Sequence, residues 1–125
     1  MSANDTTERK LAADTELVQK VLCEEKGYHY VPSSLDSKLG FANNTLGKLP
    51  LNGLRHPPTG DTNGWYIWCG EELSQEPDFF VPLHTGHLID RCPEVMRFLG
   101  LPPGSRFLVA GDHVDVWFDK SLLNV

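Results

Sequence analysis

The side chains best suited to chemistry are two histidines and two cysteines in the middle of the chain. His84 and His87 form an H-x-x-H pair, Cys92 follows shortly after, and Cys69 lies in the preceding segment. Two imidazoles and two thiolates would suit a tetrahedral zinc ion. The spacing matches no common zinc motif, however, and His84 falls before the expected helix. We therefore expect two partly exposed histidines, no metal and no cofactor, with a zinc site at His84, His87 and Cys69 as the alternative.

A catalytic thiol is the second chemistry that these residues suggest. Cys69 or Cys92 could act as a nucleophile if His84 removed its proton. Cys92 falls on an apolar helical stripe and is expected to be a small buried hydrophobe. Cys69 stands at a strand end before Gly70 and is the better candidate for exposure. No orienting group or oxyanion-hole signature accompanies either thiol, so we expect no catalytic residue.

Four acidic residues between 71 and 78 suggest a third chemistry, because paired carboxylates hydrolyse glycosides. That reaction needs two carboxyl groups held across a cleft at a defined separation. Acids gathered on one flexible loop do not provide this arrangement. The glycines of segment 53–64 likewise lack the strand–loop–helix context of a phosphate-binding loop. The sequence therefore favours recognition over catalysis.

The same acidic run follows a cluster of large rings that could anchor a partner. Trp and Tyr bring rigid contact area at low entropic cost, and an acidic rim selects basic partners. Trp65 and Phe79 are expected in the core, and Trp65 could simply pack against Trp117. The expected contact residues are Tyr66, Trp68, Glu71, Glu72, Glu76 and Asp78.

The charge is distributed unevenly along the chain. The net charge of −6 falls entirely in residues 61–125, since acids and bases balance in residues 1–60. A negative surface repels phosphate, so we expect no nucleic-acid partner, and it attracts basic proteins unless it serves solubility alone. The sequence has neither an apolar run of the ~20 residues that a membrane span needs nor a signal peptide. Its three sparse cysteines are typical of reduced thiols, and we expect a cytoplasmic protein that binds no membrane.

The residues that could contact a partner must be positioned by one small domain. Leu17, Val18, Val21 and Leu22 form an apolar stripe that predicts a helix over 14–26, with Asp14 as its N-cap and a flexible segment at 1–13. The stripe over 85–99 predicts a second helix, in which Pro93 makes a kink or begins a new helix.

Several segments are predicted to be extended. Alternating side chains indicate a strand at 64–69, with further extended segments near Phe41 and at 49–56. A hairpin is expected from 105–110 and 114–118. Together with the helices, these segments predict a single α+β domain over 14–125, with a mainly antiparallel sheet and helices packed on one face.

The layout of residues 55–107 resembles bacterial immunity-protein family thirty-three, long catalogued as a domain of unknown function. The family-like part is placed at 49–125, which leaves the 48 residues before it unaccounted for. The matching residues are Arg55, Pro57 or Pro58, Asp61, Gly64, Trp65, Gly70, Glu71, Phe79, Pro93, Pro103, Gly104, Ser105 and Phe107.

The resemblance implies a non-enzymatic cytoplasmic protein that binds and neutralises a bacterial toxin. A basic toxin domain such as a nuclease would match the negative charge. Two alternatives remain open at the level of sequence. One is a general interaction or regulatory module, and the other is a small enzyme that uses a metal or a thiol.

Overall fold

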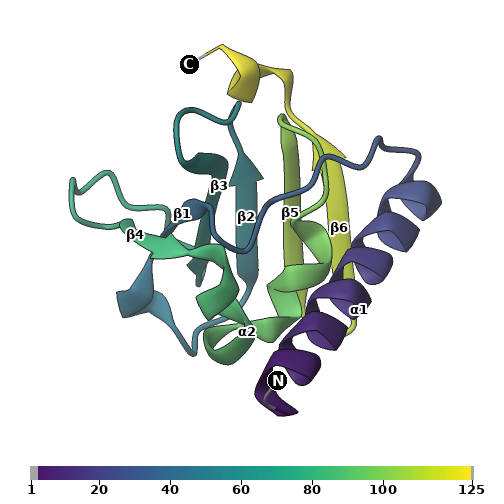
Figure 1. Ribbon diagram of the computed structural model, residues 1–125. Coiled ribbons are helices and arrows are strands. Elements are labelled where there is room, and N and C mark those ends of the chain that lie inside the picture. Colours follow the sequence, from purple (N-terminus) through teal and green to yellow (C-terminus); the bar gives the residue numbers. More distant parts are fainter. Residues whose placement is uncertain (1–2, 125) are drawn as a thin grey trace.

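The computed structural model describes residues 3–124, and the side chains of residues 13–124. Its centre is a six-stranded sheet in the order β4-β1-β3-β2-β5-β6 (Figure 1). β1 and β3 run parallel, and the other neighbours are antiparallel. The strands are β1 (Lys38–Phe41), β2 (Leu51–Arg55), β3 (Thr62–Cys69), β4 (Val81–His84), β5 (Ser105–Ala110) and β6 (His113–Phe118).

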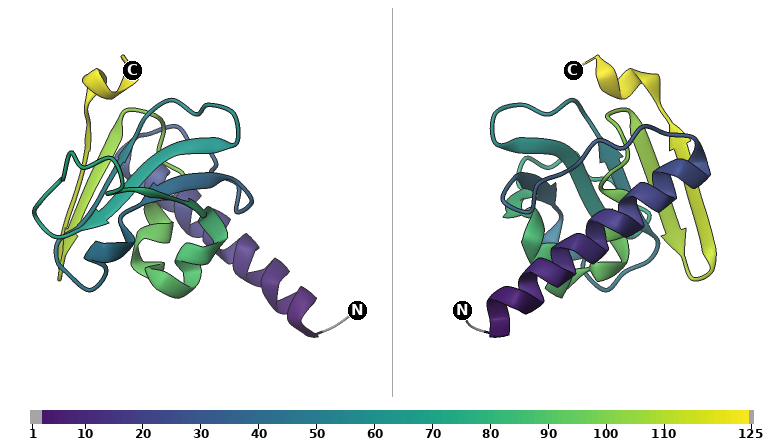
Figure 2. Two further views of the ribbon diagram at one scale, coloured as in Figure 1. Left: turned by 90° about the vertical axis from the view of Figure 1, so that its left-hand side faces the viewer. Right: turned by 45° about the vertical axis from the view of Figure 1, so that its right-hand side comes forward.

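The longer helical segments cover one face of this sheet. α1 (Ala3–Lys26), α2 (Leu88–Arg91) and the 3₁₀ helix η3 (Pro93–Phe98) lie in front of the strands in Figure 1. The opposite face carries the β3–β4 loop and the C-terminal 3₁₀ helix η4 (Lys120–Leu123), as the side view in Figure 2 shows. Two further 3₁₀ turns are η1 (Asn43–Thr45) and η2 (Thr85–His87). The predicted α+β fold, with a mainly antiparallel sheet and helices on one face, is confirmed.

Alternation along β3 supplies apolar side chains to both faces of the sheet, as the sequence pattern predicted. Trp65 and Ile67 are buried in the main core under the helices, where Phe98 stacks on Phe107 with ring centroids 4.4 Å apart. Trp68 is buried in a smaller cluster on the opposite face. That cluster also contains Ala42, Leu54 and Leu122, with Phe79 and Phe80 packed against it.

α1 differs from its prediction in both its start and its orientation. It begins at Ala3, so Asp14 lies inside the helix and is not its N-cap. The helix docks through Gln19, whose amide donates to the Met96 carbonyl at 2.7 Å, and through the buried Cys23. Leu17, Val18 and Val21 are left exposed, because these docking contacts turn their stripe outwards. The expected flexibility of residues 1–13 stays a prediction.

The other elements agree with the sequence pattern in most details. Pro93 occupies the first turn of η3, so the predicted second helix is two short helices separated at Cys92. The hairpin of β5 and β6 is confirmed. The suggested Trp65–Trp117 packing is wrong, because Trp65 packs against Phe107 under the helices while Trp117 lies beside Arg106.

Candidate functional site

Arg55 at the end of β2 is buried although no acidic side chain in the described part of the chain pairs with it. Its guanidinium donates to the carbonyl oxygens of Asn63 at 2.9 Å, Val31 at 2.8 Å and Leu101 at 2.7 Å. Burial lowers its pKa to about 10. Since these carbonyls belong to three separate segments, Arg55 ties together the 31–32 segment, the start of β3 and the turn before β5. Its function is to hold the fold.

Asn63 and Trp65 extend this buried polar centre. The Asn63 amide donates to the Thr85 hydroxyl at 2.8 Å, and its side-chain oxygen accepts from the Trp65 backbone N–H at 3.0 Å. The Trp65 indole donates to the Leu99 carbonyl at 3.1 Å. We call Arg55, Asn63, Trp65 and Thr85 the buried hub. All four side chains are buried, and the donors of Arg55, Asn63 and Trp65 are used in the bonds named above, so the hub offers a partner nothing to bind.

The candidate zinc ligands form two separate pairs, His84 with His87, whose ring centroids are 6.0 Å apart, and Cys69 with Cys92. Lys38 of β1 pairs with both His84 and Thr62, so His84 lies level with the start of β3, whereas Cys69 ends that strand. Both histidines are exposed and both cysteines are buried, which contradicts the expected exposure of Cys69. Among the described residues, no three His, Cys, Asp or Glu side chains gather as a metal site would require. The geometry therefore contradicts the alternative of a zinc site at His84, His87 and Cys69.

The buried thiols of Cys69 and Cys92 interact with each other, and the Cys92 thiol donates to Glu94 Oε2 at 3.6 Å. The bond from Cys92, together with bonds from Thr45 and the Gly47 backbone, lowers the pKa of Cys69 to about 7. The same contact and burial raise the pKa of Cys92, so Cys92 keeps its proton. Cys69 is buried, and His84 lies level with the opposite end of β3. The arrangement lacks the adjacent base that a catalytic thiol uses.

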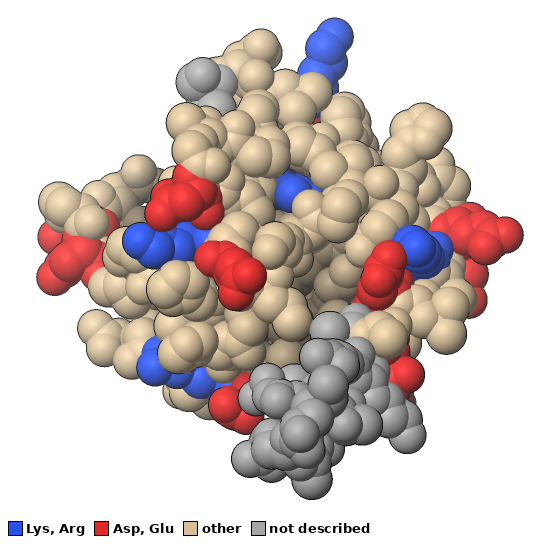
Figure 3. Space-filling view, viewed as in Figure 1, with Lys and Arg blue, Asp and Glu red and all other residues tan. Residues whose placement is uncertain are grey.

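The β3–β4 connection, residues 70–80, is the most prominent exposed feature, and we call it the acidic loop. Glu71, Glu72, Glu76 and Asp78 are all exposed, and the segment contains no Lys or Arg. The loop projects from the face opposite the helices (Figure 2). Red atoms lie at the left margin of Figure 3, where this loop appears in Figure 1, while charges of both signs alternate over the rest of that view.

The acidic loop has a rigid base. Its first backbone N–H, at Gly70, donates to the Pro50 carbonyl at 2.8 Å, and the Asn52 amide donates back to the Gly70 carbonyl at 2.8 Å. At its other end, Phe80 meets Tyr66 edge-on with centroids 5.1 Å apart and Phe79 at 4.9 Å. Both ends are thus fixed to the sheet, and the carboxylates between them are held out from it.

A cleft opens between the acidic loop and the segment that follows η1. It has a volume of about 730 Å³, and Glu71 and Glu72 line it opposite Lys48 and Leu49. Phe79 contributes an aromatic wall. The two carboxylates outnumber the single ammonium of Lys48, so the cleft carries a net negative charge and can accept a Lys or Arg side chain whose stem packs on Leu49 and Phe79.

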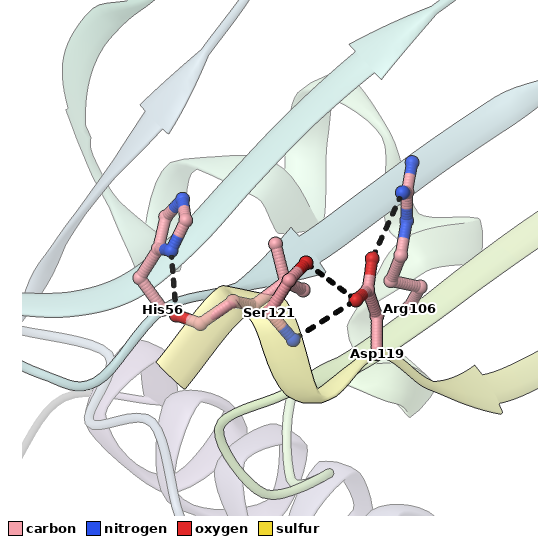
Figure 4. A network of polar contacts seen from close by, with 5 residues as sticks. His56, Arg106, Asp119 and Ser121 are labelled. Atoms are coloured by element: carbon pink, nitrogen blue, oxygen red, sulfur yellow. Dashed lines mark hydrogen bonds and ion pairs between the residues drawn. The ribbon is translucent and has the colours of Figure 1, made fainter. Parts of the chain in front are cut away.

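The C-terminal turn closes the far end of the open sheet face. Asp119 accepts from the Ser121 backbone at 3.1 Å and from its hydroxyl at 2.6 Å, and the Arg106 guanidinium approaches it at 3.5 Å (Figure 4). The His56 ring lies 2.9 Å from the Leu122 carbonyl. The bonds that Asp119 accepts from Ser121, above all from its hydroxyl, and the approach of Arg106 hold the pKa of Asp119 below its ordinary value. The network is an anchor for η4.

The structure brings most of the expected contact residues together. Tyr66 is 36% exposed and touches Phe80 at the base of the acidic loop. Trp68 is only 4% exposed, so it supports this surface from beneath and offers no ring to a partner. Sequence reasoning missed Lys48 and Leu49 because they come from a segment with weak signals, and nothing in their types marks them. It also left out the exposed Trp117 on β6.

Comparison with known proteins gives one match. A family model described as the Imm33-like domain matches residues 18–119. The match includes residues 18–48, which the resemblance seen in the sequence left unaccounted for. No curated protein and no solved structure matches the chain. Separately, the described helices include none that is both long and apolar enough to cross a membrane.

Proposed function

The chain belongs to the Imm33-like domain family, and on this premise we propose that it is a cytoplasmic immunity protein that neutralises a bacterial toxin by binding it, without catalysis. We further propose that the toxin contacts the acidic loop, the adjoining cleft and Tyr66. The observation that carries this assignment is the acidic loop itself, whose four exposed carboxylates have no basic residue among them and stand on a fixed aromatic base.

The preferred partner is a basic toxin domain, such as a nuclease. An enzyme that binds a nucleic-acid backbone presents Lys and Arg where the phosphates lie. The acidic loop would occupy that surface and exclude the substrate, while the side chains around the cleft would fix the orientation. Because both ends of the loop are tied to the sheet, little conformational entropy is lost on binding.

Electrostatic attraction of this kind makes the affinity and the association rate depend on the salt concentration. Complementary charges raise the association rate, and salt screens them. We expect the affinity for the toxin to fall as ionic strength rises, mainly through slower association. An interface dominated by apolar contacts would show little change.

The direct experiment uses any toxin domain that is encoded by a gene adjacent to this one. Calorimetry should detect a stoichiometric complex, and co-expression should rescue growth of cells that produce the toxin. The double variant Glu71→Lys/Glu72→Lys should bind at least ~10-fold more weakly, since a tenfold loss is about 1.4 kcal/mol and charge pairs at interfaces often exceed that.

The matched control is Glu24→Lys/Glu25→Lys. These two residues are also adjacent and exposed, lie on α1 away from the acidic loop, and change the net charge equally. The control should bind almost as well as the natural sequence. Equal losses in the two variants would mean that only net charge matters, and would overturn the assigned surface. Failure of the adjacent toxin to bind at all would overturn the function.

A further inference from the structure

The two edges of the sheet differ in how they are protected against pairing with another strand. β4 forms one edge, has four residues and contains Pro82, which has no N–H to offer. β6 forms the other edge, has six residues, contains neither Pro nor Lys, and within the described structure pairs only with β5. An exposed edge of this kind is a template for a further strand.

The hydrogen-bond pattern shows which residues of β6 point their backbone outwards. Ala110 and His113 face each other across a two-residue turn, and the Asp119 N–H donates to Gly104 on the β5 side at 2.7 Å. Residues 113, 115, 117 and 119 therefore direct their N–H and C=O groups towards β5. Val114, Val116 and Phe118 direct theirs away from the sheet.

The sequence of β6 is complementary to itself in one antiparallel register. With Val116 opposite the same residue of a second copy, Val114 meets Phe118 and Asp115 meets Trp117. His113 then lies opposite Asp119, but within one copy His113 already bonds Asp115 and Asp119 already bonds Ser121 and Arg106, so the apolar pairs carry the register. The neighbouring register would place Asp115 opposite Asp115, and like charges directly opposite each other are unfavourable.

A second apolar surface lies beside the same edge. Leu17 and Val21 on α1 are 62% and 45% exposed, and Val18 lines a cavity of about 430 Å³ with Met96 and Val109. Figure 1 shows α1 crossing in front of β5 and β6 on the helix-bearing face, and the left view of Figure 2 shows its N-terminal half extending away from the sheet. An exposed apolar stripe on a docked helix is expected at an interface.

We propose that two copies of this chain form a two-fold symmetric dimer, in which the β6 strands pair antiparallel about Val116 and the α1 stripes cover the seam. The two sheets become one continuous sheet of twelve strands, and outward backbone groups of residues 114, 116 and 118 find partners. A second copy is favoured over an unrelated strand because a two-fold axis requires a self-complementary patch, and both β6 and the α1 stripe lie at that axis.

The oligomeric state in solution tests the proposal. Light scattering coupled to size exclusion should give the mass of two chains for the natural sequence. Leu17→Glu/Val21→Lys should give the mass of one chain with an unchanged circular dichroism spectrum, because both side chains are exposed and leave the fold intact. The control Leu46→Glu/Leu49→Lys makes similar changes at exposed residues outside this edge and should stay dimeric. A natural sequence that is monomeric up to millimolar concentration would overturn the proposal, as would a dimer that both double variants retain.

Cross-linking tests the register. In the proposed dimer the two Val116 residues form a hydrogen-bonded pair with Cα atoms about 5.5 Å apart, a separation that a disulfide can span. Oxidation of Val116→Cys should link two chains, while Asp112→Cys in the turn should not. The three native cysteines are buried and should not interfere. Linkage of Asp112→Cys in place of Val116→Cys would contradict the register.

Discussion

The buried hub and the acidic loop use polar residues in opposite ways. In the hub, Arg55 donates to four carbonyl groups from three separate segments and has no contact with solvent that a partner could use. In the acidic loop, Glu71 and Glu72 project from a fixed base into a cleft. Residues that carry the family resemblance lie in both regions: Arg55, Gly64 and Trp65 are in or beside the hub, and Gly70, Glu71 and Phe79 are in the acidic loop. In the proposed function, the hub maintains the fold and the exposed loop contacts the toxin.

The largest effect should come from removing the hub's charge. Arg55→Met keeps most of the side-chain volume and leaves the carbonyls of Asn63, Val31 and Leu101 without a donor. Because each buried unsatisfied group costs ~1–3 kcal/mol, we expect unfolding to require about 4 kcal/mol less free energy. Urea denaturation measures this. Arg55→Lys should recover only part of the loss, since an ammonium lacks the planar fork. A change below ~1 kcal/mol would show that the hub is dispensable.

Substitutions at Trp68 and Tyr66 test which of these two β3 residues supports the fold and which contacts the partner. The Trp68 ring lies beneath the acidic loop and meets Phe80 edge-on at 6.1 Å. We expect Trp68→Ala to cost about 3 kcal/mol of stability, because a large buried ring leaves a cavity. Tyr66→Ala, at a half-exposed position on the same strand, should cost clearly less and weaken toxin binding more. A folded Trp68→Ala protein of natural stability that fails to bind would reverse this assignment.

The acidic loop itself should tolerate substitution. Glu71→Lys/Glu72→Lys is expected to change the free energy of unfolding by no more than ~0.5 kcal/mol, as exposed substitutions usually do. Thermal and urea denaturation beside the Glu24→Lys/Glu25→Lys control would measure it. A loss of stability as large as that of Arg55→Met would mean that the acidic loop also holds the fold. The proposed difference between the buried hub and the acidic loop would then be wrong.

The smallest expected effect is the loss of the stabilisation by Asp119 at acidic pH. The folded-state pKa of Asp119 is lower than its ordinary value of 3.8, because Ser121 and Arg106 stabilise the carboxylate. The stabilisation is therefore complete above pH ~4 and is lost as pH falls through the folded-state pKa. We expect Asp119→Asn to be less stable than the natural sequence at neutral pH, with the difference shrinking below pH ~4. A difference that is constant with pH would assign the effect to geometry and not to charge.

Local patterns in the sequence predicted the strands well and the docking of α1 poorly. Alternation along residues 64–69 correctly placed Trp65 and Ile67 on one face and Trp68 on the other, since a strand has a fixed period. The helical stripe Leu17–Val18–Val21 predicted the wrong buried face. The docking of α1 depends on hydrogen bonds from Gln19 and Cys23 to carbonyls nearly eighty residues away, which no local pattern encodes.

The sequence predicted only part of the candidate site, again because local patterns do not encode contacts between distant segments. The acids and Tyr66 could be found because they are close together in the sequence. Lys48 and Leu49 reach the cleft only through the pairing of β2 with β3, which brings Leu51 opposite Cys69. The sequence predicted that Trp68 is exposed, which is wrong. Alternation along a strand indicates the face on which a side chain lies, but it does not show that Phe79 and Phe80 cover that face.

Hydrogen–deuterium exchange most directly tests the claim that the buried hub maintains the fold while the acidic loop binds the toxin. Exchange would be followed in the free protein and in its complex with the toxin domain encoded by the adjacent gene. We expect binding to slow the exchange of residues 66–80 and of the neighbouring segment 44–49, while the slow amides around Arg55 and Asn63 stay unchanged. Protection that spares the acidic loop and appears on another surface would contradict the account.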